Sequence, residues 1–351
     1  MAKRFALARY NQDGSLDHGF SFGGKVLTDF DIIPEEAITA IAVDSQGRIV
    51  VGGRAWGASL ENGETRSHFV VARYDTNGSL DHAFNGDGKV ITPVGTNHYA
   101  SISALVVDDA DRVIAGGLAR SSGRDQFALA RYGSDGILDP AFGDNGIVLT
   151  HIEGALDDSI EAVELDLHGR ILVGGWVMRS TRTQFAVARY LPNGEQDSAF
   201  GASGLVFTDF DGSSAHSVEA VAIDGKGRLV AGGWATVDGQ TCYALARYTE
   251  NGALDNTFGQ NGTVLARFSA AGDEMMKSLR VDELDRIVVG GLATVEEGTR
   301  FALVPLLQRR NGGRHLQSER AGADRLSLLL NGEHPIHRDR PDRPHHRGRR
   351  G

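Results

Sequence analysis

The chain has 351 residues, 41% of them hydrophobic and 23% charged, and a formal net charge of −10. It is long enough for a sizeable core, and it contains no apolar run of the length that a membrane span or a signal peptide requires. Glycine is the outlier, with 46 residues against 8 prolines, which predicts many tight turns between short strands.

A six-residue segment, Phe5-Ala-Leu-Ala-Arg-Tyr10, recurs along the chain and predicts a short strand in each copy. The second copy begins 64 residues after the first, and four more follow at intervals of 58 residues. An Asn-Gly or Asp-Gly turn and then an aspartate follow each complete copy, so a second short strand is predicted to pair with the first. The copies begin at Phe5, Phe69, Phe127, Phe185, Tyr243 and, in shortened form, Phe301.

Each unit has a second half, such as Ile41-Ala-Val-Asp-Ser-Gln-Gly-Arg-Ile-Val-Val-Gly-Gly53, which ends in a Gly-Gly pair. Its two apolar runs flank a turn and predict another hairpin. Four short antiparallel strands in roughly sixty residues are typical of one β-propeller blade, and no run is long enough for a helix. We therefore predict an all-β fold, a β-propeller of four-stranded antiparallel blades.

The phase of the repeat bears on the number of blades. The chain starts with one half-unit, residues 5–30, and its last complete element is the other half-unit, about residues 277–293. We expect these two halves to pair in one sheet, which would close a ring of five blades without exposed sheet edges. The shortened copy at Phe301 competes for the same place, so the alternative is an incomplete arc of a six- or seven-bladed propeller.

Residues 305–351 do not continue the repeat. This segment has 11 Arg and 5 His but no aromatic residue, and its net charge is +6, whereas residues 1–304 carry −16. We predict that residues 1–304 form the propeller and that residues 305–351 are a disordered Arg/His/Pro-rich tail. Two interpretations of the tail stay open: a basic arm for nucleic acid or anionic lipid, or, as we prefer, translation of the gene in a shifted frame.

The repeat unit has a distinctive motif, Phe-Ala-Leu-Ala-Arg-Tyr-x-x-Asp/Asn-Gly-x-Leu-Asp-x-x-Phe-Gly-x-x-Gly-x-Val, followed by Ala-Val-Asp-x-x-Gly-Arg-Ile-Val-Val-Gly-Gly. This motif resembles the bacterial delta-60 repeat, a predicted β-propeller unit, and the resemblance covers residues 5–304. It implies a bacterial propeller protein of a kind that is often exported, and it implies no catalytic residue.

The sequence contains no enzyme signature that we can identify. The acidic turn that begins at Asp75 has closely spaced oxygens, as calcium loops do, but three of the five copies lack the opening ligand. The arginines that recur in every unit, such as Arg48 and Arg73, are expected to bind the recurring aspartates or carbonyl groups at the blade ends. The single cysteine, Cys242, is interpreted as an inert buried thiol. We predict no metal and no cofactor.

The connections between hairpins differ from unit to unit, whereas the turns within hairpins are nearly uniform. Strand topology places the variable connections on one face, and variable loops on a rigid scaffold are where recognition usually occurs. The longest is residues 56–68, which contains the six-residue excess of its unit. The candidate binding residues on these loops are Trp56, Glu61, Arg66, His68, Tyr99, Arg124, Arg182 and His216.

These observations predict a non-enzymatic, monomeric β-propeller that presents its variable loops to a protein or a glycan. The alternative is a hydrolase or lyase with a site at the mouth of the central channel, built from Glu161, Glu219 or Asp282. The charge of −16 on the body argues against nucleic acid as its partner. The chain begins without a signal peptide, so the sequence as written predicts the cytoplasm, and export only if the true N-terminus is missing.

Overall fold

A computed structural model describes residues 4–30, 35–58, 65–96, 99–268, 272–295 and 298–306. Within these ranges the regular structure consists of β-strands alone. In chain order the strands are β1 (Phe5–Ala8), β2 (Lys25–Thr28), β3 (Glu35–Val43), β4 (Ile49–Ala58), β5 (Thr65–Tyr74), β6 (Lys89–Thr92), β7 (Ala100–Val107), β8 (Val113–Ser121), β9 (Arg124–Tyr132), β10 (Ile147–Thr150), β11 (Asp157–Leu165), β12 (Ile171–Arg179), β13 (Arg182–Tyr190), β14 (Leu205–Thr208), β15 (Ser213–Ile223), β16 (Leu229–Val237), β17 (Gln240–Tyr248), β18 (Thr263–Ala266), β19 (Glu274–Val281), β20 (Ile287–Val295) and β21 (Gly298–Leu306).

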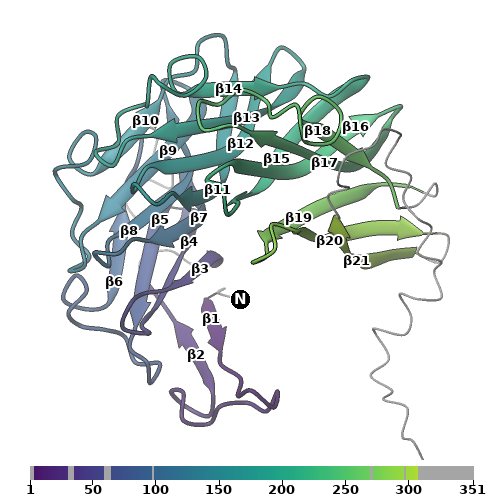
Figure 1. Ribbon diagram of the computed structural model, residues 1–351. Helices are drawn as coiled ribbons and strands as arrows, with labels where there is room; N and C mark the ends of the chain where they lie inside the picture. The colour runs from purple at the N-terminus through teal and green to yellow at the C-terminus, as the bar shows by residue number, and fades with distance from the viewer. Residues whose placement is uncertain are drawn as a thin grey trace, which may run out of the picture. The chain divides into compact units, whose positions relative to one another are not determined.

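The described strands form six antiparallel sheets, each made of strands that are consecutive in the chain (Figure 1). Four sheets have four strands: β3 to β6, β7 to β10, β11 to β14 and β15 to β18. The first strand of each of these sheets lies at one edge and the short fourth strand lies at the other edge. The all-β fold of four-stranded antiparallel units predicted from the repeat is therefore confirmed.

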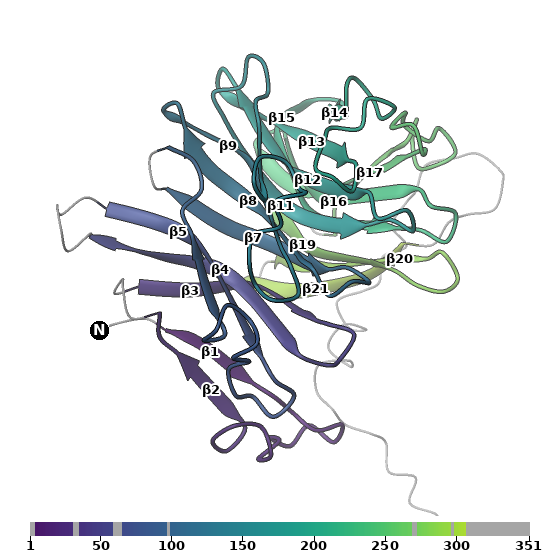
Figure 2. The same ribbon diagram turned by 90° about the vertical axis from the view of Figure 1, so that its left-hand side faces the viewer.

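The two ends of the repeat do not share a sheet. Strands β1 and β2 pair with each other as a separate hairpin, and β19, β20 and β21 form a three-stranded sheet (Figure 2). The expected pairing of residues 5–30 with the last hairpin is therefore wrong, because β21 occupies the edge of β20 that β1 would need. Strand β21 contains the shortened copy at Phe301 and follows β20 directly, so its pairing costs far less loop entropy than recruiting the distant β1. The separate terminal sheets agree with the alternative of more than five blades.

Most of the predicted tail cannot be compared with the structure. The described residues end at Leu306 in β21, so residues 307–351 lie outside them.

A β-bulge interrupts the first strand of each four-stranded sheet and of the three-stranded sheet. In β11 the pairing with β12 passes from Ile160 to Ala162, which leaves Glu161 as the extra residue. The partner strand carries the Gly-Gly pair at this point, and a Cβ added to Gly175 would lie 1.9 Å from the carbonyl oxygen of Ser159. The second glycine of the pair thus lets the backbone of the bulged strand approach closely. The same arrangement holds at Gly53, Gly117, Gly233 and Gly291.

The first glycine of each pair serves the packing of one sheet on the next. A Cβ on Gly174 would meet the side chain of Val218 in β15, and a Cβ on Gly116 would meet Val163 in β11. Each of the five apolar clusters in the described residues is shared by two sheets that follow one another in the chain. A Gly-Gly pair therefore sets both the shape of its own sheet and the closeness of the neighbouring one.

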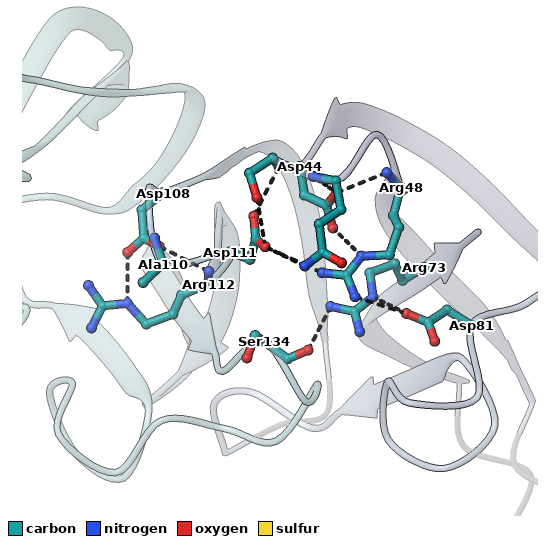
Figure 3. A network of polar contacts seen from close by, with 11 residues as sticks. Asp44, Arg48, Arg73, Asp81, Asp108, Ala110, Asp111, Arg112 and Ser134 are labelled. Atoms are coloured by element: carbon teal, nitrogen blue, oxygen red, sulfur yellow. Dashed lines mark hydrogen bonds and ion pairs between the residues drawn. The ribbon is translucent and has the colours of Figure 1, made fainter. Parts of the chain in front are cut away.

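The recurring arginines bind the recurring aspartates and carbonyl groups, as predicted, and in doing so they join neighbouring sheets. Arg73 in β5 donates from Nε to Oδ2 of Asp81 at 2.7 Å and from Nη1 to the carbonyl oxygen of Ser134, in the next sheet's hairpin, at 2.6 Å (Figure 3). Its guanidinium lies 4.5 Å from the centre of the Phe84 ring. Ion pairs to the same aspartate position recur at Arg9, Arg131, Arg189 and Arg247.

A second set of arginines closes the turn between the first and second strands. Arg48 donates to Oδ2 of Asp44 at 2.6 Å, and Asp111 from the next sheet accepts hydrogen bonds from Ser45 and Gln46 of the same turn (Figure 3). Equivalent pairs form at Arg112, Arg170, Arg228 and Arg286. Because their partners are structural, these arginines build the scaffold rather than a ring for an anionic ligand.

Buried hydroxyl pairs add a third connection between sheets. Thr92 in β6 and Tyr132 in β9 lie within 2.7 Å of each other through their hydroxyl oxygens. Equivalent pairs join Thr28 to Tyr74, Thr150 to Tyr190 and Thr208 to Tyr248. Burial raises the pKa of Tyr74 to about 12, so these phenols stay protonated and hydrogen-bonded over the working pH range.

The glycine contact predicts a specific cost of substitution. Gly175→Ala should lower the free energy of unfolding by about 3 kcal/mol or more, because the new methyl group overlaps a backbone carbonyl that the bulge holds in place. Gly123→Ala is the matched control: its Cβ would meet nothing within 4 Å, and its positive φ of 84° costs only about 1 to 2 kcal/mol. Urea denaturation of both variants measures the difference, and equal losses would contradict this account of the bulge.

Candidate functional site

The bulges place one residue from each first strand in an equivalent position. These residues, called the bulge row, are Thr39, Ser103, Glu161, Glu219 and Lys277. The strands that carry them contact one another in chain order, since β7 contacts β3 and β11, and β15 contacts β11 and β19. A bulge turns its extra residue out of the regular alternation of the strand, which is why such residues often serve a site. The bulge row combines hydroxyl, carboxylate and ammonium groups.

Hydrogen bonds fix three side chains of the bulge row, those of Glu161, Glu219 and Lys277. The Lys277 ammonium lies 2.6 Å from Oε2 of Glu219, and the Trp234 indole donates from Nε1 to Oε1 of the same carboxylate at 2.9 Å. One sheet earlier, the Trp176 indole donates to Oε1 of Glu161 at 3.0 Å. Two Trp–Glu pairs thus occupy equivalent places in adjacent sheets.

The two glutamates have different electrostatic environments. Burial raises the pKa of Glu161 above its usual value, and the charge of nearby Glu219 adds to this effect. Glu219 instead has Lys277 as a direct ion-pair partner, with its own side chain 17% exposed. Glu161 therefore takes up a proton more readily than a free glutamate, while Glu219 is held beside a cation.

A cavity of about 410 Å³ opens beside these pairs. Four groups that define it are the indoles of Trp176 and Trp234 and the carboxylates of Glu161 and Glu219. This inner cavity is also lined by Met178, Thr183, Ser217, Met275 and Lys277. Its walls combine flat apolar rings with fixed hydrogen-bonding groups, a mixture typical of small-molecule sites.

The residues predicted on the variable loops are only partly brought together. Trp56 lies near the end of β4 with the Arg54 guanidinium 4.4 Å from its ring, and Tyr99 lies under Arg120. Arg66 and His68 lie in β5, opposite the end of β4. Glu61 lies outside the described residues.

Arg124 is tied to the backbone rather than presented to solvent. It donates from Nη1 to the carbonyl oxygen of Ala155 at 2.6 Å and contacts Nδ1 of His151 at 2.5 Å. The Arg124 guanidinium thus holds one loop of the scaffold, and its side chain is half-buried.

Arg182 and the buried His216 are brought together at one cavity. Both line a second cavity of about 350 Å³, called the junction cavity, between the β12–β13 hairpin and the start of β15. The other lining residues are Arg179, Thr183, Gln184, Asp209, Phe210, Ser213 and Ser214. Thr183 lines both the inner cavity and the junction cavity.

The residues of the alternative enzymatic site are also only partly brought together. Glu161 and Glu219 share the inner cavity, but they lie within their strands rather than at strand ends. Asp282 does not join them: it accepts a hydrogen bond from Nε of Arg286 at 2.6 Å in the turn between β19 and β20. The inclusion of Asp282 was wrong, because its position is that of the scaffold aspartates Asp44 and Asp108 in the earlier turns.

Sequence reasoning missed the tryptophans and Lys277. Part of the signal was present in the repeat, because the equivalent residues of the first strands change from hydroxyl to carboxylate to amine while the residue before each stays apolar. What the repeat does not show is that a bulge turns this one position away from the sheet.

Metal and membrane sites were also considered. Among the described residues, no group of three or more His, Cys, Asp and Glu side chains is placed to hold a metal ion. The same ranges contain no helix with the length and apolarity needed to cross a bilayer.

One buried position at the sheet junctions carries different ionisable groups. The backbone N–H of Phe127 donates to Oδ1 of Asp158, and the N–H of Phe185 donates to Nδ1 of His216 at 2.6 Å. Burial raises the pKa of Asp158 to about 7, and burial lowers the pKa of His216. Both groups are therefore favoured in their neutral forms.

These shifts predict opposite pH dependences at equivalent positions. Asp158 keeps a proton in the folded state that the unfolded chain releases near pH 3.8, so its contribution is lost as the pH rises from about 4 to about 7. Asp158→Asn should remove that loss, which amounts to as much as about 4 kcal/mol. For His216 the sign is reversed, since the unfolded state binds the proton more readily and acidification destabilises the fold. Urea denaturation between pH 4 and 8 of Asp158→Asn and His216→Asn tests both signs, and parallel curves for the two variants would contradict them.

Comparison with known proteins bears on the repeat. Segments 3–20, 45–84, 111–142, 169–200 and 227–258 match the family described as "Domain of unknown function (DUF5122) beta-propeller". No curated protein matches the chain. Each matched segment contains one recurring arginine and the aspartate that it binds. These arginines are Arg9, Arg73, Arg131, Arg189 and Arg247.

Several solved structures are similar at low identity. An aldose sugar dehydrogenase from Streptomyces coelicolor in its PQQ-bound form has a TM-score of 0.45 and 13% identity, over 86% of this chain and 98% of that one. A mannose phosphorylase from Leishmania mexicana has a TM-score of 0.37 and 8% identity, over 76% and 83%. A GH32 beta-fructofuranosidase from Bombyx mori has a TM-score of 0.39 and 10% identity, over 77% and 63%. Together, the matched repeat segments and the four-stranded antiparallel sheets support a β-propeller-type repeat fold for the chain.

Proposed function

We propose that the protein is a non-enzymatic, monomeric binding scaffold whose ligand is a glycan held at the inner cavity. The observation that carries this proposal is the pair of Trp–Glu hydrogen bonds at equivalent places in adjacent sheets, both beside one cavity of about 410 Å³. We also propose, from its sequence motif, that the repeat unit is the delta-60 repeat.

The chemistry of the lining favours a sugar ring over a peptide. Indole rings offer flat apolar faces for the C–H faces of a sugar, and carboxylates accept hydrogen bonds from its hydroxyl groups. Each indole N–H is already engaged by a carboxylate, so the orientation of Trp176 and Trp234 is fixed before a ligand arrives. Preorganisation of this kind lowers the entropy cost of binding.

Residues near strand ends contribute further walls of the site. Thr183, beside the turn between β12 and β13, lines the inner cavity, and Met178 and Met275 supply adaptable apolar surface. The floor of the proposed site comes from Glu161, Glu219 and Lys277 of the bulge row.

A hydrolase is the second candidate, and one observation favours it. Glu161 has a raised pKa while Glu219 is paired with Lys277, which is the division of roles expected of a general acid and a carboxylate base or nucleophile. In such a mechanism Glu161 would give its proton to the leaving oxygen of a glycosidic bond. Glu219 would attack the anomeric carbon directly or deprotonate a water that does so.

Substitution of the indole tests the binding proposal. Trp234→Ala should weaken the best ligand of a glycan array by about tenfold or more, because it removes both the stacking face and the N–H that orients Glu219. Trp56→Ala is the matched control, since Trp56 lies on β4 and outside the lining of the cavity. Isothermal titration calorimetry measures the affinities. A failure of every glycan to bind, or equal effects of the two substitutions, would overturn the proposal.

Glu161→Gln separates the two candidates. In a binding scaffold the amide still accepts the indole hydrogen bond, so affinity should change by less than about tenfold. In a hydrolase the same change removes the acid and should lower kcat by roughly 100-fold or more while binding persists. Release of reducing ends from the bound glycan is the measurement, and its absence in the wild type excludes the hydrolase for that ligand.

A further inference from the structure

The junction cavity differs from the corresponding places between other sheets. In the preceding junction the backbone N–H of Asp125 donates to Oδ1 of Asp157 at 2.9 Å, and in the following one the N–H of Thr241 donates to Oδ1 of Asp273 at 2.7 Å. The corresponding residue in β15 is Ala215, which lies at the same register position opposite the second strand. Thr183 is the residue equivalent to Asp125 and Thr241. The carboxylate that accepts the backbone N–H in both flanking junctions is therefore missing at Thr183.

Polar side chains near the missing carboxylate line the junction cavity. The hydroxyl of Thr183, Nε of Arg179 and Oε1 of Gln184 are buried and have no hydrogen-bond partner. Buried polar atoms are nearly always satisfied, so three unsatisfied atoms lining one cavity indicate a missing ligand. A second bulge, at Ser214, interrupts β15 here, whereas the corresponding residue, Leu156, precedes the first residue of β11.

Charge and geometry favour a carboxylate in this place. The Arg179 guanidinium is held 4.3 Å from the Phe207 ring and donates from Nη2 to the carbonyl oxygen of Glu153 at 3.4 Å. Arg182 is exposed and lies on the same rim. Two arginines and one carboxylate of the protein, Asp209, therefore line the cavity, and the Asp209 side chain is 76% exposed and contacts His216.

We infer that the junction cavity binds the carboxylate of an acidic sugar residue, in the place that Asp157 and Asp273 occupy in the flanking junctions. Arg179 and Thr183 would donate hydrogen bonds to that carboxylate, and Oε1 of Gln184 would accept one from a neighbouring hydroxyl. A uronate presents both kinds of group on one ring, whereas a simple anion leaves Gln184 unsatisfied. The inference rests on the proposed function, because Thr183 lines both cavities and a single glycan can occupy them together.

Ala215→Asp is the decisive variant. It introduces the carboxylate found in both flanking junctions, so the fold should accept it without loss of Tm, and the new side chain should occupy the ligand's place. The probes are two matched tetrasaccharides, one ending in glucuronate and the other in glucose, titrated by calorimetry at fixed ionic strength. The wild type should bind the acidic probe about tenfold more tightly or better, and Ala215→Asp should abolish this preference while leaving the neutral affinity unchanged.

A second variant keeps the test independent of how Ala215→Asp folds. Arg182→Gln copies Gln240, the residue at this position in the next sheet, and removes a charge from an exposed side chain. It should reduce the preference for the acidic probe several-fold.

The outcomes distinguish the two proposals. Equal binding of both probes to the wild type overturns the carboxylate site and leaves the glycan site standing. An acidic preference that survives in Ala215→Asp also overturns the carboxylate site. If neither probe nor any other glycan binds, the proposed function fails and this inference fails with it.

Discussion

The close approach of a backbone carbonyl to the second glycine of each Gly-Gly pair is the contact on which the rest of the structure depends. The carbonyl of Ser159 can sit against Gly175 only because no Cβ stands between them. That approach permits the bulge, and the bulge turns Glu161 toward the cavity rather than into the sheet. A local steric condition on one residue type thus determines which side chains can meet a ligand.

The scaffold and the site divide the polar residues between them. Arginines and aspartates that recur in every unit are consumed by ion pairs and by the carbonyl groups of the next hairpin, as Arg73 is by Asp81 and Ser134. Residues that change from unit to unit stand in the bulge row and at the junctions, where Asp157 gives way to Ala215. Repetition therefore marks structural roles, and departure from repetition marks the places where chemistry can differ.

Much of the fold could be predicted because its causes are local. Turn glycines, alternating apolar residues and the repeated arginines are visible along the chain, and their strands and ion pairs follow from short-range rules. The pairing of the chain ends could not be predicted, because it depended on whether the copy at Phe301 or the strand at Phe5 took the edge of β20. The inner cavity was half visible: Glu161 and Glu219 stand out as acidic residues, whereas their tryptophan partners emerge only when the register of β11 with β12 is known. The missing carboxylate at Ala215 can likewise be recognised only by comparison with the hydrogen bonds that Asp157 and Asp273 accept in the flanking junctions.

The bulge row has a consequence for how such a protein can change over evolutionary time. Each member of the row comes from a separate unit, and the glycine that permits its bulge lies on the backbone of that same unit. A mutation that exchanges Glu161, Glu219 or Lys277 alters a single wall of the cavity and leaves the arginine–aspartate ion pairs of the other units intact. New ligand preferences can therefore be assembled one unit at a time, by substitution at positions outside the repeated contacts of the scaffold.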